Sequence, residues 1–375
     1  MATTLTNSST TVSDTGSAGS CLTHPQGRFG RILICILLTV AALFLLNKLF
    51  MPKYMSGIYE GALVAEYYAS EKNHQLLIIG DCEAYENISP ITLWEEYGIT
   101  SYIRGSAQQL TWQSYYLLED AFRYEKPQTV IFSVLAMKYK TPQSEAYNRL
   151  TLDGMRLSSS KIEAIKTSMT QGESLISYLL PLFRYHDRWQ ELSWDDVRYL
   201  FKRRGVSHNG FMMRCDVKPL GSLPTPPKLG DYALSENCWA YLDKIRELCA
   251  EHGAELILVK APVPYPHWYP EWDAQVSDYA VNHRLLYLNA LNELDAIGIN
   301  FTYDTYDGGL HLNLNGAEKF SRYLGGLLNE RGLPDLRHDE EISAIWAEKV
   351  REYTAMKDAQ LAELEITGRV ATFLK

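Results

Sequence analysis

Two short segments combine residue types that could carry out acyl transfer. In the first, IGDCEA at residues 79–84, the thiol of Cys82 follows an apolar run. The second, YDGGLHLN at residues 306–313, contains Asp307 and His311. A thiolate can attack an acyl carbonyl, an imidazole can take the thiol proton, and a carboxylate can hold the imidazole in the required tautomer. Cys82, His311 and Asp307 are therefore the candidate nucleophile, base and orienting residue.

The first segment follows an expected strand in a chain where strands and helices alternate. Apolar runs predict strands at residues 75–79, 99–103, 129–135, 255–259 and 300–303. Helical spacing predicts helices between them, one opening with Ser89 and Pro90 as N-cap and first position, and others at 107–124, 239–252, 282–297 and 316–330. This alternation predicts an α/β fold with a parallel sheet covered on both faces. Ligands bind beyond the carboxyl ends of such strands, which is where Cys82 lies.

Between residues 138 and 234 the alternation stops. Helical pieces at 161–178 and 194–202 precede a Pro-rich stretch, LPTPPK, and we interpret this part as a helical insertion. It contains the polar and aromatic cluster YHDRW at 185–189. His186 is therefore a candidate substrate contact, although an exposed helix end explains it equally well. Asp81 and Glu83, which flank the thiol, are further candidates.

One apolar block near the N-terminus predicts a transmembrane helix. Residues 32–46 carry no charge, and residues 47–51 extend the block to about 20 residues, enough to cross a bilayer. A cleaved signal peptide is the alternative, but the polar leader is long and no A-x-A-like site follows. The Ser- and Thr-rich leader is typical of a disordered tail, so we place the larger part outside the cytoplasm. The expected organisation is a disordered cytoplasmic tail at 1–30, a single transmembrane helix at 31–51, a linker helix at 52–73, an α/β domain at 74–335 and an amphipathic helix at 336–375.

Composition excludes several functions. The net charge of −9 argues against nonspecific binding to nucleic acid. Six cysteines without CxxC spacing indicate neither a metal site nor a dense disulfide framework, and no cofactor is expected. Cys215, Cys238 and Cys249 could include one disulfide. Cys238 and Cys249 share an expected helix about 16 Å apart, so they should not bond to each other. The apolar positions of residues 340–364 indicate a docking face or a short coiled coil.

Both chemical segments resemble the SGNH (GDSL) hydrolase superfamily. GDC stands where the family has its GDS block, and DGGLHLN resembles the C-terminal Asp-x-x-His block, about 230 residues further on. The resemblance implies a flavodoxin-like three-layer sandwich and an oxyanion hole formed by the backbone N–H groups of Cys82 and Gly105. The anchored topology resembles extracytoplasmic acyltransferase-like members, such as the D-alanyl transfer protein of teichoic acid modification and the alginate O-acetylation proteins. It implies transfer of a D-alanyl or acetyl group to a cell-envelope polymer through a Cys82 thioester, with an MBOAT-type acyl exporter as partner.

Three departures from the family pattern keep alternatives open. The family nucleophile is Ser and here it is Cys82. The Gly-x-Asn-Asp block has no match, since the third expected strand runs into Ser133 to Met137. The spacing from Asp307 to His311 is four rather than three, which leaves Asp304 as a competing orienting residue. The alternatives are therefore an SGNH esterase or deacylase of envelope glycans, or an inactive module that binds glycan or scaffolds an exporter through its C-terminal helix.

Overall fold

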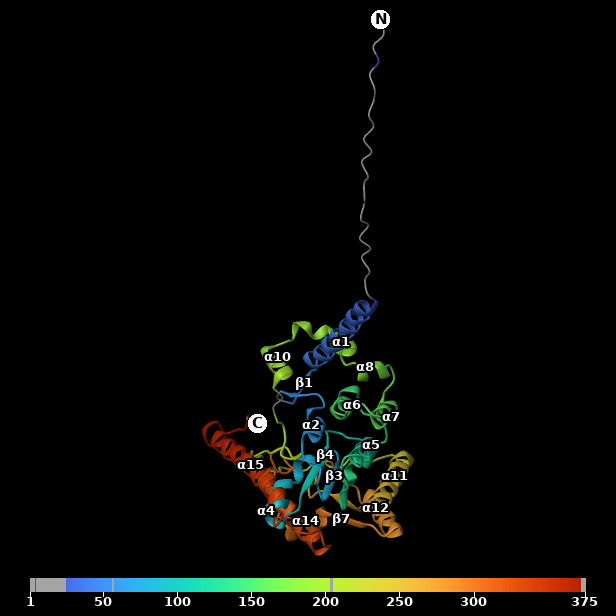
Figure 1. Ribbon diagram of the computed structural model, residues 1–375. Coiled ribbons are helices and arrows are strands. Elements are labelled where there is room, and N and C mark those ends of the chain that lie inside the picture. Colours follow the sequence, from blue (N-terminus) through green and yellow to red (C-terminus); the bar gives the residue numbers. More distant parts are fainter. Residues whose placement is uncertain (1–3, 5–24, 56, 203–204, 372–375) are drawn as a thin grey trace. The chain divides into compact units, whose positions relative to one another are not determined.

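The computed structural model describes Thr4 and residues 25–55, 57–202 and 205–371 (Figure 1). The chain divides into two compact units, Met1–Leu46 and Asn47–Lys375. Helix α1 (Pro25–Leu49) contains a stretch, Arg28–Leu49, with a mean hydropathy of 2.6, which is long and apolar enough to cross a membrane. A signal sequence would meet the same criterion. The expected tail at 1–30 lies largely outside the described residues, and its last six residues are already helical.

A five-stranded parallel sheet forms the centre of the larger unit. Its strands are β3 (Leu76–Gly80), β4 (Ser101–Gly105), β5 (Thr129–Ser133), β6 (Glu255–Lys260) and β7 (Leu286–Asn289). They lie in the order β4-β3-β5-β6-β7, and each neighbouring pair is parallel. Numbered from β3, this is the order 2-1-3-4-5 of flavodoxin-like folds, and the expected fold class is confirmed.

Helices cover both faces of this sheet and make three layers. Leu76 and Ile78 of β3 belong to one apolar cluster and Leu77 and Ile79 to the other, as the period-2 alternation of a strand requires. The first face is covered by α3 (Cys82–Asn87), α4 (Pro90–Tyr97), α13 (Leu294–Ile297), α14 (Leu314–Glu330) and α15 (Glu340–Thr367). The second is covered by α5 (Thr111–Ala121), α7 (Ser159–Ser168), α11 (Glu236–His252) and α12 (Pro270–His283).

Two expected elements near the last strand are wrong. The helix expected at 282–297 is interrupted, because α12 ends at His283 and Arg284 adopts the left-handed conformation at φ 56°. Residues 286–289 then pair with β6 as the edge strand β7, followed by the 3-10 helix η4 (Ala290–Glu293) and α13. The strand expected at 300–303 is a turn, in which Asn300 N–H donates to Asp304 at 2.7 Å.

The segment expected as a linker helix at 52–73 contains a hairpin instead. Strands β1 (Lys53–Tyr54) and β2 (Ile58–Tyr59) pair antiparallel, and α2 (Ala62–Glu66) and the 3-10 helix η1 (Tyr67–Ala69) follow. Gly61 has φ +68°, and a Cβ there would lie 2.1 Å from the backbone nitrogen of Gly154. Glycine is therefore required where the hairpin meets the insertion.

Helices fill the first two thirds of the insertion. They are α6 (Glu145–Leu152), α7, α8 (Leu175–Leu179), α9 (Leu182–Tyr185), the 3-10 helix η3 (His186–Gln190) and α10 (Trp194–Phe201). Described residues 205–235 lack helices and contain one isolated bridge, between His208 and Phe211. There the Asn209 side chain donates to Ser101 O at 3.0 Å, and the Asn209 backbone carbonyl accepts from Ile103 N at 2.9 Å. The insertion thus returns to cover the edge strand β4.

The C-terminal helix α15 packs against this same unit. Trp346 is buried and stacks on Trp94 of α4, with ring centroids 5.2 Å apart. Gln360 is also buried, where it accepts from Cys215 N and donates to Met213 O. The apolar side of α15 is therefore occupied within the domain, and the expectation of a docking face or coiled coil is corrected.

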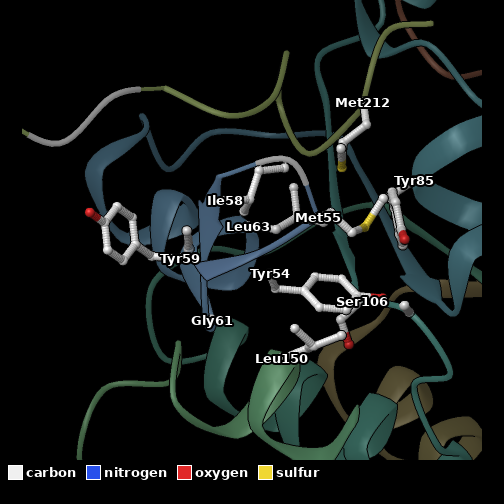
Figure 2. Close-up of a pocket in the computed structure, with 12 residues that line it drawn as sticks. Tyr54, Met55, Ile58, Tyr59, Gly61, Leu63, Tyr85, Ser106, Leu150 and Met212 are labelled. Atoms are coloured by element: carbon white, nitrogen blue, oxygen red, sulfur yellow. The ribbon is translucent and has the colours of Figure 1, made fainter. Parts of the chain in front are cut away.

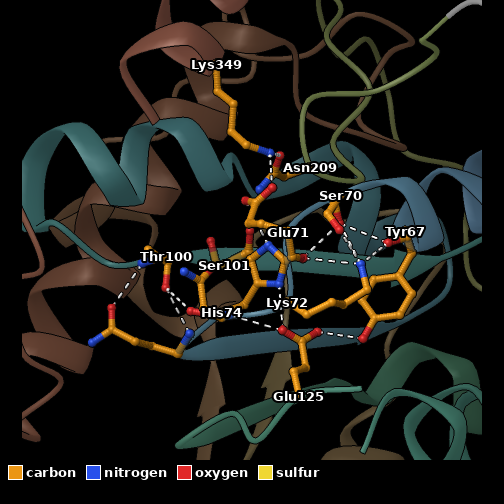
Figure 3. A network of polar contacts seen from close by, with 12 residues as sticks. Tyr67, Ser70, Glu71, Lys72, His74, Thr100, Ser101, Glu125, Asn209 and Lys349 are labelled. Carbon is orange, nitrogen blue, oxygen red and sulfur yellow. Dashed lines mark hydrogen bonds and ion pairs between the residues drawn. The ribbon is translucent and has the colours of Figure 1, made fainter. Parts of the chain in front are cut away.

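A buried polar network fixes the chain just before β3. Figure 3 shows His74 between two carboxylates, with Nδ1 2.8 Å from Glu125 and Nε2 3.2 Å from Glu71. Burial disfavours the imidazolium, but both carboxylates outweigh it and raise the pKa of His74. Lys349 of α15 reaches Glu71 at 2.9 Å, and Tyr67 donates to Glu125 at 2.6 Å. The start of the central strand is thereby tied to both the hairpin segment and α15.

Candidate active site

The turn between β3 and α3 places Cys82 at the carboxyl end of the central strand. Gly80 has φ +153°, and a Cβ there would lie 2.5 Å from the Cβ of Ser133, so the turn requires glycine. Asp81 is the N-cap of α3 and accepts from Glu83 N at 3.2 Å. Cys82 is the first residue of the helix and is partly buried. The thiol thus lies at the switch point between β3 and β5, where flavodoxin-like folds bind ligands.

A tight loop before α14 positions His311. Asp307 Oδ1 accepts the backbone N–H groups of Leu310 and His311, at 3.2 and 2.9 Å. Its Oδ2 lies 2.7 Å from His311 Nδ1. Leu312 N donates to Asn87 of α3 at 2.7 Å, which ties the loop to the helix that begins with the thiol. The four-residue spacing is therefore compatible with a carboxylate that orients both the backbone and the ring.

Asp304 has other partners. Its buried carboxylate accepts from Asn300 N at 2.7 Å and pairs with Lys319 at 2.7 Å. Of the two aspartates that the sequence left open, Asp307 is the one in contact with the imidazole.

The second nitrogen of His311 is available for Cys82. Nε2 is buried and has no hydrogen-bond partner within the described ranges, whereas Nδ1 faces Asp307. Burial raises the pKa of the Cys82 thiol to about 11 and the Asp81 carboxylate adds to this, while the interaction with His311 opposes both. The structure thus brings Cys82, His311 and Asp307 together, with a thiol that is neutral at rest.

Glu86 is a site residue that the sequence reasoning missed. It lies one helical turn after Cys82, and its carboxylate is 3.5 Å from His311 Nδ1. Burial lowers the pKa of His311, but Glu86, Asp307 and Cys82 outweigh it and raise that pKa well above the usual value. The i, i+4 spacing from the thiol was the one signal in the sequence that could have indicated Glu86.

Tyr306 and Arg214 complete the surroundings of the imidazole. The Tyr306 hydroxyl donates to Glu86 and lies 3.4 Å from His311 Nδ1. Its ring is nearly parallel to the imidazole, at a centroid distance of 5.9 Å. The guanidinium of Arg214 lies 4.5 Å from the Tyr306 ring centroid. Arg214 comes from the end of the insertion, so the insertion contributes one wall of the site.

The three residues expected to contact substrate, Asp81, Glu83 and His186, lie in environments that differ from one another. Glu83 is buried and pairs with Lys260 Nζ at 2.7 Å, and this ammonium also donates to two backbone carbonyls. Asp81 is fully buried, its Oδ2 lacks a hydrogen-bond partner among the described residues, and burial followed by Glu83 raises its pKa to about 7. His186 is exposed in η3, with Nδ1 3.3 Å from Phe183 O, and is not among the residues that contact the imidazole.

Gly105 lies beside the thiol turn, as an oxyanion donor would. It ends β4 in register with Gly80, and a Cβ on it would be 3.1 Å from Gly80 O and 3.4 Å from Asp81 O. A side chain at this position would require the turn to shift by a few tenths of an ångström. After β5 the chain forms the 3-10 helix η2 (Val134–Lys138), whose sequence VLAMK supplies no asparagine.

An apolar cavity adjoins these residues. It holds about 310 Å³, open space at its mouth included, and is lined by Tyr54, Met55, Ile58, Tyr59, Gly61, Ala62, Leu63, Tyr85, Ser106, Ala107, Leu150 and Met212. Figure 2 shows the Tyr54 ring pointing toward Ser106, the residue after Gly105. Tyr85 is one turn after Cys82 in α3. Burial raises the pKa of Tyr54 to about 12, and Cys82 is among the groups that add to the shift. The cavity therefore shares a wall with the thiol site.

Other possible ligand groups are sparse. Within the described ranges, no group of three or more His, Cys, Asp or Glu side chains is arranged to hold a metal ion. Cys215, Cys238 and Cys249 are buried and carry free thiols, so no disulfide joins any of the three.

Comparison with known proteins gives fold-level likenesses. No protein-family model matches the sequence, and no curated protein is significantly similar to it. A proposed lipolytic protein of the G-D-S-L family from Desulfitobacterium hafniense aligns at 13% identity and a TM-score of 0.35, covering 68% of this chain and 99% of its own. A proposed acylhydrolase from Bacteroides fragilis aligns at 9% identity and a TM-score of 0.35, covering 71% and 94%. Likenesses this loose carry no conclusion about activity.

Proposed function

We propose that this protein is a membrane-anchored, extracytoplasmic acyltransferase of SGNH type that transfers an acyl group to a cell-envelope polymer through a thioester on Cys82. The observation that carries the proposal is the meeting of Cys82, His311 and Asp307, which come from segments about 230 residues apart. A thiol, an imidazole and a carboxylate in this order form the apparatus of nucleophilic acyl transfer.

The first half-reaction acylates the thiol. His311 Nε2 takes the thiol proton, and the Cys82 sulfur forms a bond to the acyl carbonyl carbon. The N–H groups of Cys82 and Gly105 stabilise the oxyanion. When the tetrahedral intermediate collapses, the bond to the leaving group breaks and His311 returns the proton to that group. In the second half-reaction an acceptor hydroxyl gives its proton to His311, its oxygen bonds to the carbonyl carbon, the carbon–sulfur bond breaks, and His311 returns the proton to the Cys82 sulfur.

The charges around His311 support this sequence of proton transfers. Glu86 and Asp307 both favour the imidazolium, which is the species formed when His311 accepts a proton. The same charges raise the pKa of His311 well above its usual value, so His311 accepts the thiol proton only at a pH at which the imidazole is itself neutral.

The cavity beside the thiol supports an uncharged acyl group. None of its lining residues is charged, whereas a D-alanyl group carries an ammonium that needs a carboxylate or other acceptors. The apolar walls fit an acetyl group or a somewhat longer alkyl chain. Of the two acyl types that the resemblance implies, we therefore propose the acetyl type.

The remaining parts of the proposal concern location and partners. Helix α1 supports a single-pass anchor, and the Ser- and Thr-rich leader supports an extracytoplasmic position for residues 47–375. By resemblance, the acyl donor is supplied by an MBOAT-type exporter, and the acceptor is an envelope glycan or a teichoic acid. A tethered catalyst gains effective concentration on both.

Intact-mass spectrometry tests the covalent step. Full-length protein is incubated with p-nitrophenyl acetate, and an increase of one acetyl group is expected for the wild type and for a Cys249→Ala control. The Cys82→Ala variant should show no adduct. An equal adduct on Cys82→Ala, or none on the wild type, would refute the thioester. If the acetyl group is lost from Cys82 at the same rate with and without an added acceptor polyol, the protein hydrolyses the thioester and is an esterase.

The length of the acyl chain tests the cavity. Each methylene buried in an apolar site contributes about 0.8 kcal/mol, or a factor of about 4 in rate. The wild type should therefore be acylated faster by p-nitrophenyl butyrate than by the acetate. Leu150→Phe fills the cavity and should abolish that preference while leaving acetylation intact. A preference for butyrate that survives Leu150→Phe would exclude this cavity as the acyl site.

A further inference from the structure

The insertion exposes large apolar side chains that its own helices leave uncovered. They lie on four consecutive short elements, α8, α9, η3 and α10, and comprise Ile176, Phe183, Trp189, Trp194 and Phe201. Trp189 and Trp194 are 64% and 79% exposed, and each of the other six tryptophans is at least partly buried. Exposed tryptophans are unusual on a surface that faces only water, because most of the ring is apolar.

The same segment is attached to the chain that leaves the apolar helix. Leu182 N donates to the Asn47 side chain at 2.7 Å, and the guanidinium of Arg188 donates to Phe50 O at 2.6 Å. Arg188 is also within 4.0 Å of Asp196. These contacts lie within the unit Asn47–Lys375 and tie both α9 and η3 to residues 47–50.

A second set of contacts ties α10 to the hairpin strand that follows. Lys53 donates to Ser193 Oγ at 3.0 Å and lies within 3.8 Å of Asp196. The Tyr59 ring stacks on Tyr199 of α10 at a centroid distance of 3.8 Å. Figure 1 shows α8, α10 and β1 at one end of this unit, with α12 and α14 at the other. The exposed aromatic residues therefore belong to the end from which the membrane segment departs.

Chain length sets how far this end can lie from a bilayer. Lys53 is four residues after Leu49, the last residue of α1, so it is at most about 14 Å away. The headgroup layer on each side of a bilayer is about 5–8 Å thick. If α1 spans the membrane, residues 50–53 must lie within this distance of its end, and α9, η3 and the start of α10 are bound to residues 47–53.

We propose that residues 175–201 form a surface that lies on the lipid bilayer, with Trp189 and Trp194 inserted at the headgroup level. Tryptophan is enriched at this depth because its ring is apolar and its N–H can still reach water. Short helices with exposed aromatic side chains bind the interface in the same way. The proposal rests on α1 spanning the membrane and on no catalytic step. In this arrangement the domain contacts the lipid through residues 175–201 as well as being tethered to the membrane by α1.

Fluorescence quenching in nanodiscs tests the proposal on the full-length protein. Nanodiscs of phosphatidylcholine and phosphatidylglycerol are prepared with and without bromine on the acyl chains, which quenches tryptophans close to it. We expect the brominated lipid to quench the wild type, and we expect the Trp189→Phe/Trp194→Phe double variant to lose more than half of that quenching. Phenylalanine keeps the side chains apolar, so the variant should remain folded and anchored.

Trp239→Phe is the matched control, since Trp239 is partly buried on α11 and should keep the wild-type quenching. The proposal is overturned if the double variant is quenched as much as the wild type, or if bromine has no effect on the wild type. In that case the aromatic surface serves a protein partner. Failure of the wild type to enter nanodiscs would overturn both the anchor and this surface, while leaving the thioester test unaffected.

Discussion

Replacing Asp81 by Asn should make Cys82 react faster with an alkylating reagent. Asp81 is the N-cap of α3, and Asn is an equally good cap, so the turn that presents the thiol is retained. What changes is charge. After burial, the Asp81 carboxylate is the largest contribution that raises the Cys82 pKa to about 11. Without this negative charge, the thiolate forms more readily.

The size of the effect follows from two opposing terms. A charge this close shifts a neighbouring pKa by about 1, which increases the thiolate fraction about 10-fold. Nucleophilicity falls with thiol pKa, with a Brønsted slope of about 0.4–0.5, and this removes a factor of about 3. The net expectation is alkylation about 3-fold faster. Asp81 itself has a pKa raised to about 7. The difference in Cys82 labelling rate between Asp81→Asn and the wild type should therefore be full above about pH 8. It should fade below about pH 6, where the wild-type carboxyl is neutral too.

The assay is time-resolved labelling with iodoacetamide, followed by peptide mapping of each cysteine from about pH 6 to about pH 9. Cys249 is the internal control, because burial alone raises its pKa and no charge near the site affects it. Equal or slower labelling of Cys82 in Asp81→Asn at high pH, with α3 intact by hydrogen exchange, would show that the Asp81 charge does not act on the thiol.

Three further outcomes are expected. Glu86→Gln removes an anion that favours the imidazolium, so the His311 pKa should fall, and the acid limb of thioester formation should move to lower pH. Lys260→Met leaves Glu83 buried and unpaired, which should lower the free energy of unfolding in urea by about 3–5 kcal/mol. Gly80→Ala forces a Cβ into contact with the neighbouring strand and should destabilise the protein by about 1–3 kcal/mol, with loss of acylation.

Each of these predictions has either an outcome that would contradict it or a control variant. A pH profile of Glu86→Gln identical to that of the wild type would remove Glu86 from the site. Adding Glu83→Gln to Lys260→Met should restore most of the lost stability, since the uncompensated charge is gone, and no recovery would contradict the ion-pair argument. Gly221→Ala is the match for Gly80→Ala, because nothing lies within 4 Å of its Cβ position, and its stability should stay unchanged.

The sequence predicted the central strands because their signals are local. The runs that became β3, β5 and β6 are apolar, bounded by turns and buried on both sides, so no other element fits them. Strand β7 was missed for the opposite reason. Its four residues are mostly half exposed at the sheet edge, and they are a strand only because β6 pairs with them. That pairing is a tertiary contact, and helical spacing across residues 282–297 gave no indication of it.

In the candidate site, too, the sequence predicted what depends on local signals and missed what depends on tertiary contacts. The sequence could propose Cys82 and His311 from their types and spacing, but it could not choose between Asp304 and Asp307. The choice depends on a cation from α14, Lys319, which engages one carboxylate and leaves the other for the imidazole. For Glu86 the sequence offered only its spacing from Cys82, and its contact with His311 follows from the way the loop before α14 is anchored to α3.

Helix α15 has a consequence for local stability. Through Gln360 it holds the backbone of Met213 and Cys215, on either side of the Arg214 that packs over Tyr306. No strand of the sheet supports this stretch with ladder hydrogen bonds in the described residues. A partial opening in which α15 detaches would therefore free the backbone on both sides of Arg214 while the five strands stay paired, and Arg214 would then be held through its carbonyl, which accepts from Leu314 N at 2.7 Å.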